Sequence, residues 1–284
     1  MSASLFSLRG KTALITGGTR GIGAAIAIGL AEAGADIILI QRDPNNMQTR
    51  DTILSLSRRC EIVISDLSHP THLEYLLPRI LSNITPKMAY PPPPSSTIAE
   101  NGTLIDPITV PIPNNAIHIL INAAGIQARY PATDFPLAEF QRVLDTNLTA
   151  TFVLCRDMGR YWVERGIKGR IVNVGSLLQF QGGLTVLGYT ASKGGVAQIT
   201  KGFSNEWAGR GIGVNAIAPG YVSTEMNTAL IGDPVRSRQI MERIPAGRWG
   251  RPEDFKGPAV FLCSDAAAYV SGETLVVDGG WMGR

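Results

Sequence analysis

Few residues of this sequence are suited to cross-linking or to metal binding. Its 284 residues include three cysteines and three histidines. The cysteines are an odd number, far apart and without a C-x-x-C pair, which excludes a disulfide framework or a zinc ribbon and favours a reducing compartment. The histidines have no cysteine near them in a ligand pattern, so we predict no metal site.

Long apolar runs and an excess of one charge are also missing. No stretch of about 20 uncharged apolar residues occurs, and the first residues lack a basic segment followed by an apolar one. We therefore expect a cytoplasmic protein without a membrane span. The 26 Lys and Arg against 23 Asp and Glu give a net charge of +3. This balance is too even for a protein whose main partner is nucleic acid or an anionic membrane.

The sequence does contain a regular alternation of short apolar runs and helical segments, and 44% of its residues are hydrophobic. Runs such as 12–16 (TALIT) and 36–40 (DIILI) are typical of strands that are covered on both faces, as in parallel sheets. The predicted strands are 12–16, 36–40, 61–65, 117–121, 170–175, 213–218 and 274–278. The predicted helices are 21–33, 136–147, 148–165, 189–209 and 253–264. We predict a single α/β domain over 1–284, a Rossmann fold with a doubly wound, seven-stranded parallel sheet.

Two segments interrupt this alternation. Residues 84–115 contain eight of the 18 prolines and no helical period, which predicts a surface insertion rather than a second domain. Residues 221–250 are punctuated by Gly232, Pro234 and Pro245, which favours a mobile lid over a substrate.

A glycine-rich loop follows the first predicted strand. It reads Thr16-Gly-Gly-Thr-Arg-Gly-Ile-Gly23 and opens a predicted helix. Glycines let the backbone approach a pyrophosphate closely, and the N-terminus of the helix directs free N–H groups at the anion. A plain strand-to-helix turn would not need four glycines in seven residues, so we predict a dinucleotide site.

The end of the second predicted strand carries Gln41 and Arg42 where dinucleotide sites usually have an acid for the ribose 2′-OH. Arg20 lies inside the glycine loop. Two guanidinium groups would suit a 2′-phosphate, which favours NADP(H) over NAD(H). Two alternatives stay open: both arginines are ordinary surface charges, or Asp43 serves NAD(H).

A tyrosine and a lysine share one face of a predicted helix. Tyr189 and Lys193 are four residues apart. A free tyrosine has a pKa of about 10, and a neighbouring ammonium favours the phenolate, which would make Tyr189 a general acid or base. Ser176 ends the fifth predicted strand, at the sheet edge where ligands bind. A Y-x-x-x-K pair alone is usually structural.

Together these motifs resemble the short-chain dehydrogenase/reductase family. The matching motifs occur in family order: T-G-x-x-x-G-x-G at 16–23, D-L at 66–67, N-A-A-G at 122–125, N-L at 147–148, Ser176, Y-T-A-S-K at 189–193 and P-G-Y-V-x-T at 219–224. They span the chain except the proline-rich insertion. The family usually forms tetramers through two long helices, so the resemblance also implies a homotetramer or a homodimer.

The resemblance implies a role for each matching residue. Ser176 would polarise a substrate carbonyl, Tyr189 would transfer the proton, Lys193 would lower the pKa of Tyr189 and hold a ribose, and Asn147 would hold a water. The implied cofactor contacts are Gly17, Thr19, Arg20, Gly21, Ile22, Gly23, Gln41, Arg42, Asp66, Leu67, Asn122, Ala123, Gly125, Tyr189, Lys193, Pro219, Gly220, Val222 and Thr224. Ala123 stands where many family members have a second asparagine.

A narrower resemblance is to the 2-deoxy-D-gluconate 3-dehydrogenase group. It rests on S-L-L-Q-F-Q-G-G at 176–183, N-E-W-A at 205–208, R-I-P-A-G-R-W-G at 243–250 and V-D-G-G-W-M-G-R at 277–284. It implies a small-molecule alcohol or ketone substrate, a sugar acid or polyol. Gln179 and Gln181 are candidates for its hydroxyl groups and Arg129 for a carboxylate, although each also suits an ordinary loop position.

Two alternatives to this function remain. Apolar residues such as Phe180 and Leu184 would suit a reductase of a lipophilic, polyketide or 3-oxoacyl ketone. A protein of a different class, a nucleotide sensor that lost its chemistry, could retain the same fold. The intact set of Asn147, Ser176, Tyr189 and Lys193 argues against the sensor.

Overall fold

The computed structural model describes residues 5–83 and 116–284 and contains one seven-stranded sheet. The strand order is β3-β2-β1-β4-β5-β6-β7, and all neighbouring strands are parallel. The chain therefore starts near the middle of the sheet and winds outward in both directions. The predicted doubly wound α/β fold is confirmed, and the predicted insertion at 84–115 lies outside the described residues.

The strands form where the apolar runs predicted them. Each is short and rich in branched side chains, and helices cover both faces of the sheet, so nearly every position of the central strands is buried. The strands are β1 (Thr12–Thr16), β2 (Asp36–Gln41), β3 (Cys60–Ile64), β4 (Ile119–Asn122), β5 (Arg170–Val174), β6 (Gly213–Pro219) and β7 (Thr274–Val277).

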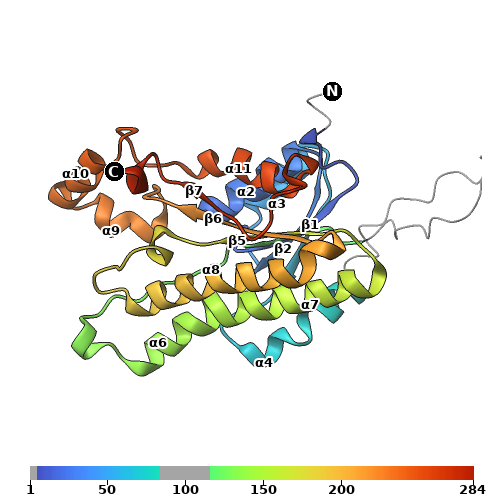
Figure 1. The fold of residues 1–284 in the computed structure, drawn as a ribbon, viewed down its shortest axis with the longest axis horizontal. Coiled ribbons are helices and arrows are strands. Elements are labelled where there is room, and N and C mark those ends of the chain that lie inside the picture. Colours follow the sequence, from blue (N-terminus) through green and yellow to red (C-terminus); the bar gives the residue numbers. More distant parts are fainter. Residues whose placement is uncertain (1–4, 84–115) are drawn as a thin grey trace, which may run out of the picture.

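Helices form a layer on each face of the sheet (Figure 1). One layer consists of α2 (Gly21–Glu32), α3 (Gln48–Ser55) and α11 (Lys256–Cys263). The opposite layer consists of α4 (Pro70–Leu73), α5 (Leu76–Asn83), α6 (Leu137–Leu144), α7 (Ala150–Arg165) and α8 (Leu187–Trp207), in which α7 and α8 lie side by side. Strand residues alternate between the two cores, with Leu14 on the α7 side and Ala13 and Ile15 on the α2 side.

A wide helical turn joins α6 to α7. Sequence periodicity predicts one helix ending at 147 and the next beginning at 148. The structure instead has a π-helical turn, Asp145–Thr149, with Asn147 at its centre and almost fully buried. Such turns insert one extra residue and often mark functional sites. Here the turn carries Asn147 past the regular helix position and toward the sheet edge.

The segment between β6 and α11 leaves the sheet and returns to it. It contains α9 (Thr228–Ile231) and α10 (Pro234–Arg243), which lie with the C-terminus at one end of the molecule (Figure 1). Its two ends meet at an isolated parallel bridge between Val222 and Gly250. Beneath it, Trp281 packs in a small apolar cluster with Leu177 and α10. We call residues 223–249 the lid segment.

Within residues 5–83 and 116–284 we found no helix long and apolar enough to cross a membrane. The same residues contain no group of three or more His, Cys, Asp or Glu side chains that could hold a metal ion.

Candidate active site

Most of the candidate site residues lie at the carboxyl ends of the strands. The glycine loop follows β1, Gln41 ends β2, Asn122 ends β4, Ser176 lies two residues beyond β5 and Pro219 ends β6. Because all seven strands are parallel, these ends meet at one edge of the sheet. This is the edge where open α/β sheets bind their ligands.

The glycine loop packs tightly against the loop after β4. The Thr16 hydroxyl accepts hydrogen bonds from the backbone N–H groups of Ala123 (3.1 Å) and Ala124 (3.2 Å). Gly17 has φ +66°, and a Cβ placed on it would lie 2.7 Å from the Ala124 nitrogen. Only glycine fits both the left-handed backbone and the close approach. The residues therefore form the narrow backbone cradle that a pyrophosphate requires.

The first helical turn after this cradle presents free backbone N–H groups. Arg20 is the N-cap of α2 and makes no side-chain cap, so the orphan donors of the helix stay open to an anion. The Arg20 guanidinium instead pairs with the Glu225 carboxylate at 2.6 Å. Thr224, the residue before this glutamate, lies 3.4 Å from where a Cβ of Gly21 would be.

Gln41 is buried, with 4% of its surface exposed, and shapes the turn after β2. Its amide nitrogen donates to the carbonyls of Asp43 (2.6 Å) and Asn46 (2.9 Å). Its amide oxygen has no hydrogen-bond partner among the described residues. Arg42 is exposed, and the Asp43 carboxylate accepts from the Asn45 N–H at 2.8 Å. An unsatisfied buried acceptor and an exposed guanidinium thus lie together where the adenosine ribose of a dinucleotide would be held.

Asp66 and Leu67, after β3, have different environments. The Asp66 carboxylate accepts from the Ser68 N–H (2.9 Å) and from the Ser68 hydroxyl (2.8 Å). The backbone hydrogen bond is the largest of the effects that lower the pKa of Asp66. Asp66 is exposed, whereas Leu67 is buried in the core on the α7 side. Asp66 is therefore a charged acceptor on the solvent side of the sheet edge.

Ser176 and Tyr189 lie close enough to hydrogen-bond through their side chains. Burial raises the pKa of Tyr189 above its usual value, and the hydrogen bond with Ser176 lowers it by less. Ser176 caps the 3₁₀ helix Leu177–Gln179, and its hydroxyl accepts from the Leu178 N–H at 3.2 Å. The phenol is therefore neutral at physiological pH and is positioned to donate a proton next to the serine hydroxyl.

Lys193 is buried one helical turn after Tyr189. Its ammonium donates to the Val174 carbonyl at 2.6 Å and lies 5.5 Å from the centre of the Tyr189 ring. Burial lowers the pKa of Lys193 to about 8. Burial is the largest cause that shifts the pKa of Tyr189, and the Lys193 ammonium is directed at a backbone carbonyl. The lowering of the Tyr189 pKa by Lys193 stays a prediction.

Asn147 connects the loop after β4 with α8. Its amide nitrogen donates to the Ile126 carbonyl (2.9 Å) and to the Ser192 hydroxyl (3.0 Å). Its amide oxygen accepts from the Ile126 N–H at 2.9 Å. The Ser192 hydroxyl in turn donates to the Tyr189 carbonyl at 2.7 Å. A Cβ on Gly125 would lie 3.6 Å from the Asn147 oxygen and 3.8 Å from the Lys193 nitrogen. The π-helical turn thus brings Asn147 to Gly125, which the Lys193 ammonium of α8 also approaches.

Asn122 is turned into the protein interior. Its amide nitrogen donates to the Asn173 oxygen (2.9 Å) and to the Cys155 sulfur (3.3 Å). Asn173 donates onward to the Thr200 hydroxyl at 3.0 Å. This buried network joins β4, β5, α7 and α8 beneath the site. The side chain of Asn122 supports the sheet edge, whereas the glycine loop contacts the next two residues, Ala123 and Ala124.

The loop after β6 closes the other side of the sheet edge. Pro219 and Val222 are buried, and Thr224 is partly exposed. A Cβ on Gly220 would lie 2.7 Å from the Cα of Asp278, so glycine is needed for this close approach. The loop therefore has a fixed path from β6 to the start of the lid segment.

The three candidate substrate residues have different surroundings. The Gln179 amide accepts from the Ser176 N–H (3.4 Å) and donates to the Thr274 hydroxyl (3.1 Å). Gln181 is partly exposed. Arg129 is exposed and donates to the Gln127 oxygen at 3.5 Å. Gln179 thus supports the backbone of Ser176, whereas Gln181 and Arg129 remain accessible to a ligand.

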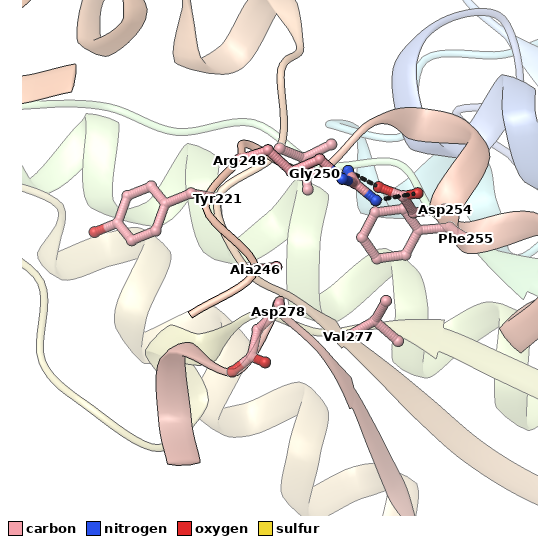
Figure 2. Close-up of a pocket in the computed structure, with 10 residues that line it drawn as sticks. Tyr221, Ala246, Arg248, Gly250, Asp254, Phe255, Val277 and Asp278 are labelled. Carbon is pink, nitrogen blue, oxygen red and sulfur yellow. Dashed lines mark hydrogen bonds and ion pairs between the residues drawn. The ribbon is translucent and has the colours of Figure 1, made fainter. Parts of the chain in front are cut away.

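A cavity of about 190 Å³ lies at the foot of the lid segment, apart from the four candidate catalytic residues. Figure 2 shows Arg248 and Asp254 paired beside it, with Asp278 and Val277 below. The two ion-pair contacts are 2.7 and 2.9 Å. The Asp278 carboxylate accepts from the N–H groups of Gly280 and Met282, both at 2.8 Å. These polar groups already have hydrogen-bond partners within the protein. We therefore interpret the cavity as a packing gap under the lid segment and not as the substrate site.

Sequence reasoning missed Glu225 and Gln127, which attach the start of the lid segment to the rest of the protein. Glu225 pairs with Arg20, and the Gln127 amide donates to the Met226 carbonyl at 3.0 Å. Both contacts join segments about a hundred residues or more apart in sequence. Neither has a motif, so only the fold reveals them.

Comparisons with known proteins identify the family of this chain. The model of the short chain dehydrogenase family matches residues 11–86, and the family model described as enoyl-(acyl carrier protein) reductase matches residues 113–282. The chain belongs to the short-chain dehydrogenase/reductase family. The predicted membership is confirmed, and with it the prediction that the protein is an oxidoreductase acting on CH–OH groups.

Individual members of this family cover nearly the whole chain. A 2-dehydro-3-deoxy-D-gluconate 5-dehydrogenase from Pseudoalteromonas atlantica is 44% identical over 281 residues, 98% of each chain. The enzyme of the same name from Bacillus subtilis is 46% identical and covers 98% of this chain and 97% of its own. The crystal structure of a gluconate 5-dehydrogenase from Burkholderia cenocepacia, in complex with NADP and tartrate, has a TM-score of 0.85 at 32% identity and full coverage of both chains.

Proposed function

We propose that this protein is an NAD(P)-dependent oxidoreductase that interconverts a secondary hydroxyl group and a ketone on a sugar acid. The observation that carries the proposal is buried Lys193, whose ammonium lies 5.5 Å from the centre of the Tyr189 ring, at the sheet edge where the Ser176 side chain lowers the pKa of Tyr189. The similarity over the whole chain to sugar-acid dehydrogenases supports the substrate class.

In this proposal each residue of the site has one task. The Ser176 hydroxyl binds and polarises the substrate oxygen, and the Tyr189 hydroxyl gives that oxygen its proton as the ketone is reduced. Lys193 binds a hydroxyl group of the ribose and returns a proton toward Tyr189. Asn147 positions the residues around Lys193 through its bonds to Ile126 and Ser192. A bound nicotinamide cofactor supplies the hydride. In the oxidation direction the same groups act in reverse.

The cofactor would lie over the glycine cradle, with its pyrophosphate at the N-terminus of α2. Gly17, Thr19, Gly21, Ile22 and Gly23 would form the cradle wall. Asp66, Leu67, Asn122, Ala123 and Gly125 would line the adenosine half, and Pro219, Gly220, Val222 and Thr224 the nicotinamide half. We favour NADP(H) over NAD(H), because Arg20 and Arg42 are guanidinium groups near the position of the 2′-phosphate and both are exposed.

The substrate would bind between the catalytic residues and the lid segment. With the bracketing residues 221, 222 and 250, this segment makes up the predicted mobile lid, 221–250, of a single domain over 1–284. Arg129 would pair with its carboxylate and Gln181 with a hydroxyl group. A lipophilic ketone is the second candidate substrate, since Phe180, Leu184 and Leu187 are 51%, 83% and 43% exposed around the same loop.

We also propose that the protein forms a homotetramer or a homodimer. The feature that supports an interface on α7 and α8 is the aromatic stack that Phe152, Phe203 and Trp207 form across these two helices.

The testing experiment measures initial rates of NADPH and NADH oxidation with a panel of ketones. The panel contains keto sugar acids, neutral keto sugars, diketones and one bicyclic aromatic ketone. Turnover restricted to the sugar acids is the expected result. Turnover of the lipophilic ketones alone would overturn the substrate class. Binding of NADPH without turnover of any compound would favour a nucleotide sensor, and light scattering that shows a monomer would overturn the oligomer.

A further inference from the structure

Arg20, which lies in the glycine loop and is the N-cap of α2, forms an ion pair within the chain. Its Nη1 lies 2.6 Å from Oε2 of Glu225, at the start of the lid segment. The two side chains are 64% and 72% exposed, so neither is part of the core. Exposed ion pairs contribute little to stability, because solvent screens the two charges. Stability alone therefore gives no strong reason for this pair.

The position of this ion pair indicates a role in cofactor binding. Arg20 is the N-cap of α2, beside the open N–H donors of the helix. Glu225 directly follows Thr224, whose methyl group lies against Gly21. The Glu225 carboxylate is therefore the anion that the protein itself brings to Arg20, beside the place that the proposed cofactor phosphates would take.

The turn that carries Glu225 has a second, independent attachment. Gln127 donates to the Met226 carbonyl at 3.0 Å, and Asn227 donates to the Val222 carbonyl at 2.9 Å. The path of the turn does not depend on the ion pair. The carboxylate can thus be exchanged for an amide while the surrounding backbone keeps its attachments.

We infer that Glu225 is a specificity-determining residue, which competes with the 2′-phosphate of NADP(H) for Arg20 and so reduces the preference for NADP(H) over NAD(H). This inference rests on the proposed function. The 2′-hydroxyl of NAD(H) carries no charge and does not compete with a carboxylate for a guanidinium. Loss of the Glu225 charge should therefore strengthen the binding of one cofactor and not of the other.

Binding of cofactor fragments tests the inference without turnover. Isothermal titration calorimetry with 2′,5′-ADP and 5′-AMP compares ligands that differ by the 2′-phosphate. We expect Glu225→Gln to lower the Kd of 2′,5′-ADP about threefold to fivefold, as for the loss of one exposed ion pair, and to leave that of 5′-AMP within about twofold. The gain should shrink in about 0.5 M salt, because exposed charges are screened.

Two further variants make the test specific. Glu242→Gln removes the same charge from an exposed position on α10 and should change neither Kd. In an Arg20→Gln background, Glu225→Gln should have no effect on either ligand. Equal tightening of both ligands, or an unchanged Kd for 2′,5′-ADP, would overturn the inference. Failure of the unaltered protein to bind either fragment would overturn the proposed function itself, together with the inference.

Discussion

The four candidate catalytic residues, Asn147, Ser176, Tyr189 and Lys193, form what we call the catalytic corner. It is adjacent to the lid segment, but the two regions differ in how deeply their side chains are buried. Asn147, Ser192 and Lys193 are at most 4% exposed, and their side chains bond to backbone or to one another. In the lid segment, Val235 is 67% exposed, and Ile240 is the buried residue of α10. The proposed chemistry thus belongs to a rigid frame, and the proposed substrate selection belongs to a segment held by a few contacts.

This contrast shows where changes should be tolerated. Residues of the frame are bound on several sides, so a substitution there affects both folding and proton transfer. The lid segment is attached by one strand bridge, a few side-chain bonds and the cluster around Trp281. Substitutions there should alter substrate binding and leave the frame intact.

The largest effect should follow removal of the Tyr189 hydroxyl. Tyr189→Phe should lower kcat about 10³-fold, since general acid catalysis contributes roughly 10² to 10⁴. Binding of NADPH, followed by fluorescence titration, should stay the same. Tyr161→Phe, on the buried side of α7, is the control and should retain activity. A Tyr189→Phe protein with more than about a tenth of the original kcat would contradict the assigned role.

Acid should lower the stability of the fold through His118, which lies away from the active site. Burial lowers the pKa of His118 to about 4, against an unfolded value of about 6.5. Between these values the unfolded chain binds more protons, so the free energy of unfolding should fall by about 3 kcal/mol as pH falls from 6.5 to 4. Urea denaturation at several pH values measures this.

The matched variant for that experiment is His118→Asn. The introduced amide oxygen could still accept the bond that the Thr12 N–H gives to Nδ1 of His118 at 3.3 Å, but an amide does not titrate. The stability of this variant should depend less on pH in this window. An unchanged slope would assign the acid sensitivity to other groups.

Alkaline pH should act on the catalytic corner. The pKa of Lys193 is about 8, whereas that of Tyr189 is raised above its usual value. As pH rises through 8, Lys193 loses its charge, and kcat/KM for ketone reduction should fall about tenfold for each further pH unit. Stopped-flow rates at low substrate concentration measure kcat/KM at each pH. A value of kcat/KM that stays constant up to about pH 9.5 would contradict the prediction.

The smallest effect should come from the foot of the lid segment. Arg248 donates to Asp254, and these hydrogen bonds are the main cause that lowers the pKa of the Asp254 carboxyl. Asp254→Asn weakens a partly exposed pair, so KM for the substrate should rise about threefold and kcat should change less than about twofold. Glu164→Gln, in the exposed pair with Arg165, should change neither constant. Equal losses in kcat for both variants would contradict a local role.

Much of the fold could be predicted from the sequence, because the patterns that indicate its strands and its glycine loop are local in the sequence. Buried runs such as 36–40 form a strand in any parallel sheet, and glycines after a strand mark the cradle. Helices α3, α5 and α10 lie outside the predicted elements. In α3 and α10 few residues are buried, Thr49 and Ile53 in α3 and Ile240 in α10, so hydrophobic periodicity is weak there. In α5 the apolar spacing of Leu76, Leu77 and Ile80 was a usable signal that the sequence reading missed. Asp233 before Pro234 was the usable signal, since its carboxylate caps α10.

The site was predictable to the level of residue type and strand end. Ser176 lies at the carboxyl edge of the sheet because β5 is parallel to its neighbours, which the sequence pattern indicates. Tyr189 and Lys193 are four residues apart, so both lie on one face of α8. The direction of each side chain was not predictable. Asn122 points into the core, Gln179 bonds to Ser176 and Thr274, and Arg20 pairs with Glu225. These choices depend on neighbours that are distant in sequence.

The bridge between Val222 and Gly250 has a consequence for how such an enzyme could diversify. The Ser223 N–H donates to the Gly250 carbonyl, and the Gly250 N–H donates to the Tyr221 carbonyl, both at 2.9 Å. Everything between these residues enters and leaves the fold at a single hydrogen-bonded point. The 27 intervening positions, 223–249, form a cassette. A descendant gene could exchange that cassette by recombination, acquire a new substrate range and inherit the catalytic frame without realigning any strand.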